Sequence, residues 1–285
     1  MRLVGAVLGV LLLLIVLMVG VVYMNGQRQL RQYYDNPAPN VAVAATSEQV
    51  ARGRYLVRSF ADCVGCHATN LAADPPLLDG NRLAELEALG TFDAPNLTPG
   101  RLADWSDGEI VRAIREGVSK DGRGLMIMPA DDYSHLSDQD VQAIVAFLRS
   151  QPAVEKETPP LQPSFLGSML LGSGQIGATR QPPLGQVGAP PRAPTAEYGA
   201  YLASVAGCSG CHGPNLDGEN IPPGPPKGPN LRAVKGWTEA QFVQTLRTGT
   251  TPQGRQLGDR MPWKAYRQGT DDDLRAVYAF LGGLP

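Results

Sequence analysis

Two short cysteine motifs constrain this chain more than any other feature of its sequence. All four cysteines among the 285 residues lie in the motifs CVGCH and CSGCH. A zinc site or a pair of redox-active dithiols could use the same cysteines, but neither needs a histidine after each pair. The chain has only three histidines, so chance does not explain one after both motifs. The residues concerned are Cys63, Cys66 and His67 in the first motif, and Cys208, Cys211 and His212 in the second.

The spacing C-x-x-C-H predicts covalent attachment of haem. Two thiols one helical turn apart can add to the two vinyl groups of a haem, and the adjacent imidazole then binds the iron. We therefore expect two covalently bound haem c groups, with His67 and His212 as iron ligands. Haem is attached in this way outside the cytoplasm, so the chain after Met24 is expected on the periplasmic or outer side of a bacterial inner membrane.

An apolar segment near the N-terminus predicts a membrane anchor. Residues 3–24 contain no charge over 22 positions, which as a helix would span about 33 Å. A cleaved signal peptide is the alternative, but the apolar run is longer than a usual signal core and no small-x-small cleavage site follows it. Arg2 before the segment, and Arg28 and Arg31 after it, mildly favour the opposite topology, which the haem expectation outweighs. A second apolar patch, FLGSMLLG from Phe165, is too short to span a bilayer, and contact with a partner or with the membrane surface both stay open.

The second half of the chain repeats the first. The segment GRYLVRSFADCVGCH corresponds to GAYLASVAGCSGCH, WSDGEIVRAIREG to WTEAQFVQTLRTG, and LSDQDVQAIVAFL to GTDDDLRAVYAFL. Apolar residues at helical spacing predict a helix in each segment, so each unit has a helix entering its CxxCH motif, one after its tryptophan and one at its C-terminal end. Ser137 and Thr270, each followed three residues later by Asp, predict caps at the start of the last helix.

The two units resemble class I c-type cytochromes, and the whole chain resembles a membrane-anchored dihaem cytochrome c. The first unit is also similar to the cytochrome subunits of membrane quinoprotein alcohol and aldehyde dehydrogenases in APNLTPG, WSDGEIVRAIREGVSKDGRGL and LSDQDVQAIVAFLRS. Those subunits usually carry three haems, whereas this chain has two motifs. The resemblance implies a mainly α-helical fold with an N-terminal transmembrane helix and two tandem class I cytochrome c domains. We expect an anchor at 1–26, a juxtamembrane linker at 27–45, domain 1 at 46–150, a Pro/Gly-rich linker at 151–194 and domain 2 at 195–285.

In class I cytochromes a methionine on the loop before the last helix binds the other face of the iron. The second unit contains a single methionine, Met261, and the repeat aligns it with Met128, each followed by proline. Met128 and Met261 are therefore the expected ligands, whereas Met126 aligns with Gly258 and is expected to be apolar filler. Water or a lysine stays open as an alternative ligand. The third histidine, His135, is expected to be a solvent-facing loop residue and not a second histidine ligand.

The resemblance also implies residues that support each haem. The carbonyl groups of Pro95 and Pro229 are expected to accept the Nδ1 protons of His67 and His212, which would fix the ring orientation. Further candidates recur at matched positions of the two units, although each could instead be a surface charge or a core side chain. They are Arg115, Arg123, Arg247, Arg255, Trp105, Trp237, Tyr133 and Tyr266.

A haem with His and Met ligands has no open position for a substrate and is biased toward high potential. The resemblance therefore implies an electron-transfer protein, without catalytic residues of its own, that relays electrons between a membrane redox complex or dehydrogenase and an acceptor. The alternative is a dihaem enzyme of the peroxidase or thiosulfate dehydrogenase type, in which one haem is open or unusually ligated. We expect the lipid bilayer and redox proteins or subunits as partners, and no nucleic acid.

The two units differ in charge. Residues 46–150 hold 16 acidic and 10 basic residues, whereas residues 195–285 hold 8 acidic and 9 basic residues. Because opposite charges guide the encounter of redox proteins, the first unit is expected to dock on a basic surface.

Overall fold

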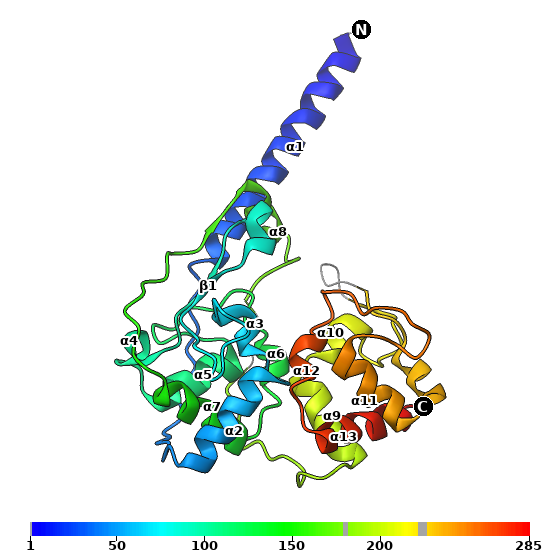
Figure 1. Cartoon of the computed structure of the whole chain (residues 1–285). Helices are drawn as coiled ribbons and strands as arrows, with labels where there is room; N and C mark the ends of the chain where they lie inside the picture. Colours follow the sequence, from blue (N-terminus) through cyan, green and yellow to red (C-terminus); the bar gives the residue numbers. More distant parts are fainter. Residues whose placement is uncertain (1, 179–181, 222–226) are drawn as a thin grey trace.

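The computed structural model describes residues 2–178, 182–221 and 227–285. It consists of two helical lobes below a long helix, α1 (Arg2–Gln29), that projects from the first lobe (Figure 1). The helix is long and apolar enough to cross a membrane. Its side chains from Leu3 to Met18 are exposed, with Leu12 at 64%. It runs three residues beyond the expected boundary at 26.

The predicted helices of both units are present. In each lobe a helix leads into a one-turn helix that holds the CxxCH motif, and further helices follow, the last of which closes the lobe. The first lobe contains α2 (Ser47–Arg58), α3 (Cys63–His67), β1 (Asn81–Arg82), η1 (Ala84–Leu89), β2 (Gly90–Thr91), β3 (Asp93–Ala94), α4 (Pro99–Leu102), α5 (Asp107–Glu116), α6 (Ala130–Tyr133) and α7 (Asp138–Ser150). The second contains α9 (Ala196–Val205), α10 (Cys208–His212), η2 (Leu231–Gly236), α11 (Glu239–Thr248), α12 (Trp263–Tyr266) and α13 (Asp271–Gly282). Between the lobes lie β4 (Gln162–Pro163) and α8 (Phe165–Gly172).

The first and last helices of each lobe cross at a glycine. α2 packs on α7 and α9 packs on α13. A Cβ on Gly53 would lie 1.9 Å from the carbonyl oxygen of Ala143, and a Cβ on Gly199 would lie 1.9 Å from that of Ala276. The two backbones therefore touch directly, and each crossing depends on the missing side chain.

The caps of the last helices form as predicted. The Ser137 hydroxyl accepts the Asp140 N–H at 3.1 Å, and the Thr270 hydroxyl accepts the Asp273 N–H at 3.1 Å. In a complete capping box the acidic side chain at the third helical position would return to the N-cap N–H. Here both aspartate side chains are used elsewhere.

The segment after α1 packs on the first lobe. The Tyr34 N–H donates to the Gly122 carbonyl at 2.8 Å, and the Asn36 side chain donates to Glu116 at 2.7 Å. Arg112, which is buried, donates to the Asn36 carbonyl at 2.8 Å. The expected juxtamembrane linker is therefore held against α5 and the loop that follows it.

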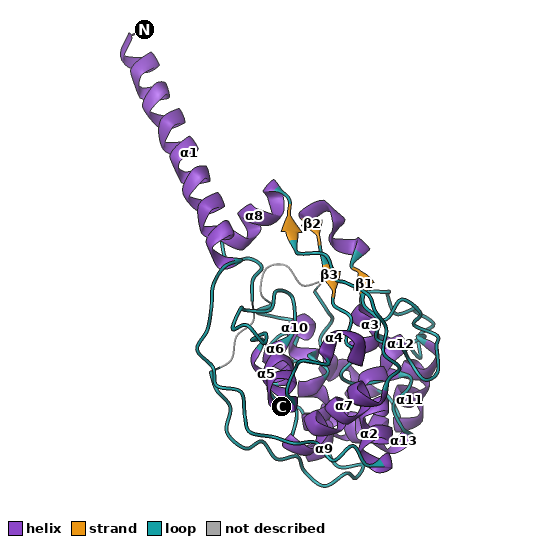
Figure 2. Cartoon of the chain, turned by 90° about the vertical axis from the view of Figure 1, so that its left-hand side faces the viewer, coloured by secondary structure: helices purple, strands orange, loops and turns teal. Residues whose placement is uncertain are grey.

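The first lobe also has an excursion, residues 68–94, whose three short strands take part in two small antiparallel pairings (Figure 2). β1 pairs with β3 inside the excursion, while β2 pairs with β4 from the expected Pro/Gly-rich linker. The second pairing places Gly90 opposite Pro163 and Thr91 opposite Gln162. This part of the linker is thus attached to the first lobe by backbone hydrogen bonds.

We predict that Gly199→Ala lowers the free energy of unfolding by about 1–3 kcal/mol. The added methyl group meets a backbone carbonyl that cannot move without separating α9 from α13. The measurement is denaturant unfolding of the haem-loaded protein. Gly282→Ala is the matched control, since a Cβ there meets nothing within 4 Å in the same helix pair. Equal stability of the two variants would contradict the crossing.

Candidate functional site

Both CxxCH motifs form one-turn helices that begin after a residue in the left-handed region. Asp62 has φ 39° and precedes Cys63, whereas Gly207 has φ 64° and precedes Cys208. No disulfide joins any of the four cysteines in the described part of the chain. Burial raises the pKa of both Cys63 and Cys208 to about 12, unlike the lowered pKa of a redox-active dithiol. Among the described residues, no group of three or more His, Cys, Asp or Glu side chains could hold a metal, so the two CxxC pairs do not form a joint zinc site.

The two motif histidines are held in the form that an iron ligand requires. Nδ1 of His67 lies 2.8 Å from the Pro95 carbonyl oxygen, and Nδ1 of His212 lies 2.7 Å from that of Pro229. A carbonyl can only accept, so Nδ1 carries the proton and Nε2 keeps its lone pair. Burial lowers the pKa of both histidines, which keeps the rings neutral. These are the contacts expected from the sequence, and this donor set fits a haem iron.

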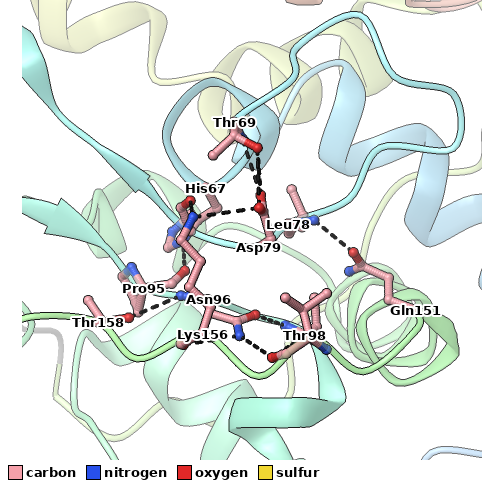
Figure 3. Close-up of polar contacts among 12 residues, drawn as sticks. His67, Thr69, Leu78, Asp79, Pro95, Asn96, Thr98, Gln151, Lys156 and Thr158 are labelled. Atoms are coloured by element: carbon pink, nitrogen blue, oxygen red, sulfur yellow. Dashed lines mark hydrogen bonds and ion pairs between the residues drawn. The ribbon is translucent and has the colours of Figure 1, made fainter.

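The loop that supplies the Pro95 carbonyl is fixed from behind by residues that follow α7 (Figure 3). The Asn96 side chain donates to the Val154 carbonyl at 2.7 Å, and its oxygen accepts the Thr98 N–H at 2.9 Å. The Val154 N–H donates back to the Thr98 hydroxyl at 3.1 Å. Lys156 donates to the Gly80 carbonyl at 2.6 Å, so the start of the expected linker also holds the loop that follows His67.

The two Met-Pro loops have the same backbone turn. The Ala130 N–H donates to the Met128 carbonyl at 2.8 Å, and the Trp263 N–H donates to the Met261 carbonyl at 2.7 Å. Both methionines are half-buried against the core. Met126 instead forms a backbone bridge with Ala178. The common turn supports the register that pairs Met128 with Met261, while iron ligation by either sulfur stays a prediction.

A tyrosine ties each Met-Pro loop to its CxxCH helix. The Tyr133 hydroxyl donates to the Ala61 carbonyl, and the Tyr266 hydroxyl donates to the Ala206 carbonyl at 2.9 Å. Ala61 and Ala206 each lie two residues before the first cysteine of a motif. The segments expected on the two sides of each haem are thus joined by one equivalent hydrogen bond in each lobe.

The lobes themselves are joined by a tyrosine that enters a helix cap of the other lobe. The Tyr201 hydroxyl accepts the Ser137 N–H at 3.2 Å and donates to Oδ2 of Asp140 at 2.7 Å. Two nitrogens of Arg52 reach both oxygens of Asp140 at 2.8 Å. Burial alone would raise the pKa of Asp140, but Arg52 and Tyr201 hold it below its usual value.

A tyrosine of the first lobe makes the equivalent contact with a helix cap of the second lobe. The Tyr55 hydroxyl accepts the Thr270 N–H at 3.0 Å and donates to the Asp273 carboxylate. Tyr55 and Tyr201 occupy matched positions of the repeat, as do Asp140 and Asp273. The interface is therefore approximately two-fold symmetric within one chain, like the interface of a symmetric dimer.

This interface brings together the residues that flank the two motifs. The ring of Phe60 stacks on that of Tyr266 with centroids 6.1 Å apart. A Cβ on Gly207 would lie 2.5 Å from a carboxylate oxygen of Asp132, so the first lobe reaches the residue before Cys208. Figure 1 shows α3, α6, α10 and α12 gathered where the lobes meet.

Comparison with known proteins agrees with this geometry. The family model of cytochrome c oxidase, cbb3-type, subunit III matches residues 48–148, and the cytochrome c model matches residues 196–285. The chain belongs to the c-type cytochromes. Its two cytochrome c domains carry the residues for two covalent haem c groups.

Three relatives show which proteins the chain is similar to in sequence. The cytochrome is 28% identical to a dihaem cytochrome c-type protein of Cereibacter sphaeroides, over 85% of the chain and 88% of the relative. It is 26% identical to the fructose dehydrogenase cytochrome subunit of Gluconobacter japonicus, over 87% of the chain and 55% of the relative. It is 31% identical to a nicotinate dehydrogenase subunit of Pseudomonas putida, over 73% of the chain and 17% of the relative. The cytochrome therefore spans about half, or less, of the length of the last two.

The arginines predicted near the haems have carboxylate partners in three of four cases. Arg115 pairs with Asp138 and Arg247 with Asp271, each at 2.7 Å, so both join the helix after the tryptophan to the start of the last helix. Arg123 pairs with Asp121 at 2.7 Å and is 55% exposed. The fourth, Arg255, has an exposed side chain. Contact of these arginines with haem propionates stays a prediction.

The remaining predicted residues lie near the core or at the surface. Trp105 and Trp237 are half-buried against the core. Their carbonyl groups accept hydrogen bonds from Arg149 and Tyr278, respectively. His135 is exposed, as expected for a loop histidine.

Two further residues near the expected haem sites were not predicted from the sequence, and contact of either with a haem stays a prediction. Arg101 lies close enough to His67 and Arg123 for charge repulsion, and its own pKa is lowered by burial and by Arg123. The indole N–H of Trp263, next to the Met261-Pro262 turn, is buried without a partner in the described part of the chain. A propionate would supply the missing acceptor. Neither residue has the same residue type at the matched position of the other unit, so the repeat did not reveal them.

We predict that Tyr201→Phe costs about 1–3 kcal/mol of stability at pH 7, because it removes a partner of the buried Asp140 and leaves the Ser137 N–H without its acceptor. The cost should shrink below about pH 4, since the stability contributed by a carboxyl group whose pKa is lowered by folding is complete above its unfolded pKa and is lost as the pH falls through its lower folded pKa. Denaturant unfolding at several pH values measures both effects. Tyr278→Phe, which loses one bond to a carbonyl within a single lobe, should cost less and show no such pH dependence.

Proposed function

We propose that this cytochrome is a membrane-anchored electron carrier that relays electrons between a membrane redox complex or dehydrogenase and an acceptor. The supporting observation is that both lobes repeat the same arrangement: a CxxCH helix, a histidine held by a proline carbonyl and a Met-Pro turn tied back to that helix. The proposed iron ligands are His67 and Met128 in domain 1, and His212 and Met261 in domain 2. Haem c, when bound, supplies a one-electron couple. His67, Met128, His212 and Met261 would hold the two irons and would leave neither of them open to a substrate.

The names of the relatives suggest the class of partner. Several are cytochrome c subunits of dehydrogenases, including a quinone-linked alcohol dehydrogenase of Gluconobacter oxydans at 26% identity. The cytochrome covers 55% of that relative. We infer that a dehydrogenase donates electrons to it, directly or within a complex. Its domains would carry those electrons onward.

The contacts at the end of α1 support an anchor that stays attached. The Asn25 side chain donates to the Gly172 carbonyl at 2.7 Å, and the Gln29 side chain donates to the Leu171 carbonyl at 2.8 Å. Cleavage of α1 as a signal peptide would remove these partners from α8. We therefore propose a single-pass protein of the inner membrane, with both haem domains on the periplasmic side.

A dihaem enzyme would need one iron without stable thioether ligation. The equivalent turns at Met128 and Met261 give no such asymmetry. The carrier is thus the function that the geometry supports best.

We predict that Met128→Ala removes the thioether-to-iron absorption band of one of the two haems and lowers the potential of that haem alone. Met126→Ala, two residues away, is the matched control and should change neither. Oxidised-minus-reduced spectra and a redox titration of the purified protein measure both properties. The wild-type protein should show no peroxidase turnover.

If Met126→Ala removes the band and Met128→Ala does not, Met126 is the ligand, and the proposed alignment of the two units is wrong by two residues. A wild-type protein with only one thioether band and measurable peroxidase turnover would favour the enzyme instead.

We further predict that electron transfer from this cytochrome to a basic soluble redox protein slows as ionic strength rises, because domain 1 carries a net negative charge that salt screens. Stopped-flow kinetics over a range of salt concentrations measure the effect. A small uncharged oxidant is the control and should react at a constant rate. Salt-independent kinetics with the basic protein would rule out electrostatic docking through domain 1.

A further inference from the structure

The short helix α8 is apolar and only partly covered by protein. Its eight residues contain no charge. Gly167, Ser168 and Leu171 are buried, whereas Phe165 is 63% exposed and Leu166 is 50% exposed. Two adjacent large apolar side chains therefore protrude from a helix that is otherwise well packed, which is typical of a surface that contacts a partner or a membrane.

The covered side of α8 packs against the last turns of α1. A Cβ on Gly26 would lie 2.1 Å from the Ser168 carbonyl oxygen, and a Cβ on Gly172 would lie 1.8 Å from that of Val22. The Gln27 side chain adds a hydrogen bond to the Ser168 hydroxyl at 2.9 Å. The two helices thus form one close-packed unit, visible at the base of α1 in Figures 1 and 2.

The exposed side of α8 lies level with the end of the apolar part of α1. The ring of Phe165 stacks on Tyr23, with centroids 5.7 Å apart and planes 19° apart. On α1 the exposed apolar side chains continue as far as Met24, which is 65% exposed. Because residues 3–24 match the thickness of the hydrocarbon layer, Tyr23 and Phe165 lie where that layer ends, the level at which aromatic rings are favoured.

The N-terminal end of α8 is attached to domain 1. The Ser164 N–H, at the start of α8, donates to the Leu89 carbonyl at 2.8 Å, and its hydroxyl donates to the Ala88 carbonyl at 3.1 Å. The adjoining β4 pairs with β2. The excursion that contains these residues continues through β3 directly into Pro95, whose carbonyl holds His67. α8 therefore links the anchor to the first haem site through ordered backbone.

We propose that α8 is a second membrane contact, which lies in the lipid–water interface with Phe165 and Leu166 in the outer edge of the hydrocarbon layer. The inference rests on the proposed anchor and extends it from one helix to two. Lipid is the occupant because the exposed face of α8 continues the lipid-facing surface of α1 at the same level. This contact would fix the orientation of domain 1 relative to the membrane.

The test uses the full-length, haem-loaded cytochrome in phosphatidylcholine nanodiscs. Tryptophan is introduced by Phe165→Trp, by Leu166→Trp, and by the control Leu71→Trp, which replaces a side chain that is 61% exposed on domain 1. Each emission is measured in lipid brominated near the headgroup and divided by the emission of the same variant in unbrominated lipid, so that quenching by haem cancels. The native tryptophans are subtracted with the wild-type protein.

We expect brominated lipid to abolish most of the emission added at 165 and 166 and to leave that at 71 unchanged. If the emission ratios at 165 and 166 are as high as the ratio at 71, in protein that has entered nanodiscs, the inference is overturned and the anchor stays intact. In that case α8 would face water or another subunit. Failure of the wild-type chain to enter nanodiscs, or an intact mass that lacks α1, would overturn the anchor and the inference together.

Discussion

The two lobes depend on a tyrosine hydroxyl placed between the amide and the carboxylate of a helix cap. In a capping box the carboxylate would bind the N-cap N–H directly. Here Tyr201 and Tyr55 each enter from the other lobe, accept that N–H and donate their own proton to Asp140 or Asp273. The caps and the interface therefore use the same atoms. Loss of these two hydroxyls would leave the Ser137 and Thr270 N–H groups without their acceptor and remove one donor from each aspartate, which is costly where the site stays buried.

The symmetry of this contact is broken at the charges around Asp140, where Arg52 and Arg192 both pair with the carboxylate. Arg52 pairs with Asp140, but the residue matched to Arg52 in the second domain is Tyr198, and among the described residues Asp273 has no equivalent ion pair. Arg52 also reaches across the interface, because its guanidinium donates to the Tyr198 hydroxyl at 3.0 Å. The buried ion pair is thus shared by both lobes. The two units therefore differ at the matched positions 52 and 198, where the single arginine binds a residue of each lobe.

Sequence patterns predicted the features that depend on local chemistry or on the repeat. The helices that enter the CxxCH motifs and the Ser137 and Thr270 caps belong to this group, whereas the contacts of His67 and His212 with proline carbonyls were implied by the resemblance to class I cytochromes. The interface was missed, although Tyr55, Tyr201, Asp140 and Asp273 were all visible as matched positions. Each fits an ordinary helix, and nothing in a local pattern reports that its partner lies in the other unit.

Segments without a counterpart in the repeat were the hardest to predict, and composition described them poorly. Residues 151–194 are rich in proline and glycine, which is typical of a linker. The structure nevertheless pairs β4 with β2, seats α8 on α1 and uses Val154 to fix the loop before α4. Composition reports how weakly a segment folds by itself. It does not report backbone partners that lie far away along the chain.

These unmatched segments converge on domain 1, and this explains why the two domains are not equivalent despite their common fold. The segment after α1 packs against Glu116, the excursion supports α8, and the start of the linker holds the Asn96 loop. Domain 1 is therefore fixed to α1 in two ways, through the segment that follows this helix and through α8. Domain 2 is positioned against it through the tyrosine caps and the stacked pair of Phe60 and Tyr266. Since these contacts flank both CxxCH motifs, the bonds that hold the domains together also set the separation of the two haem sites.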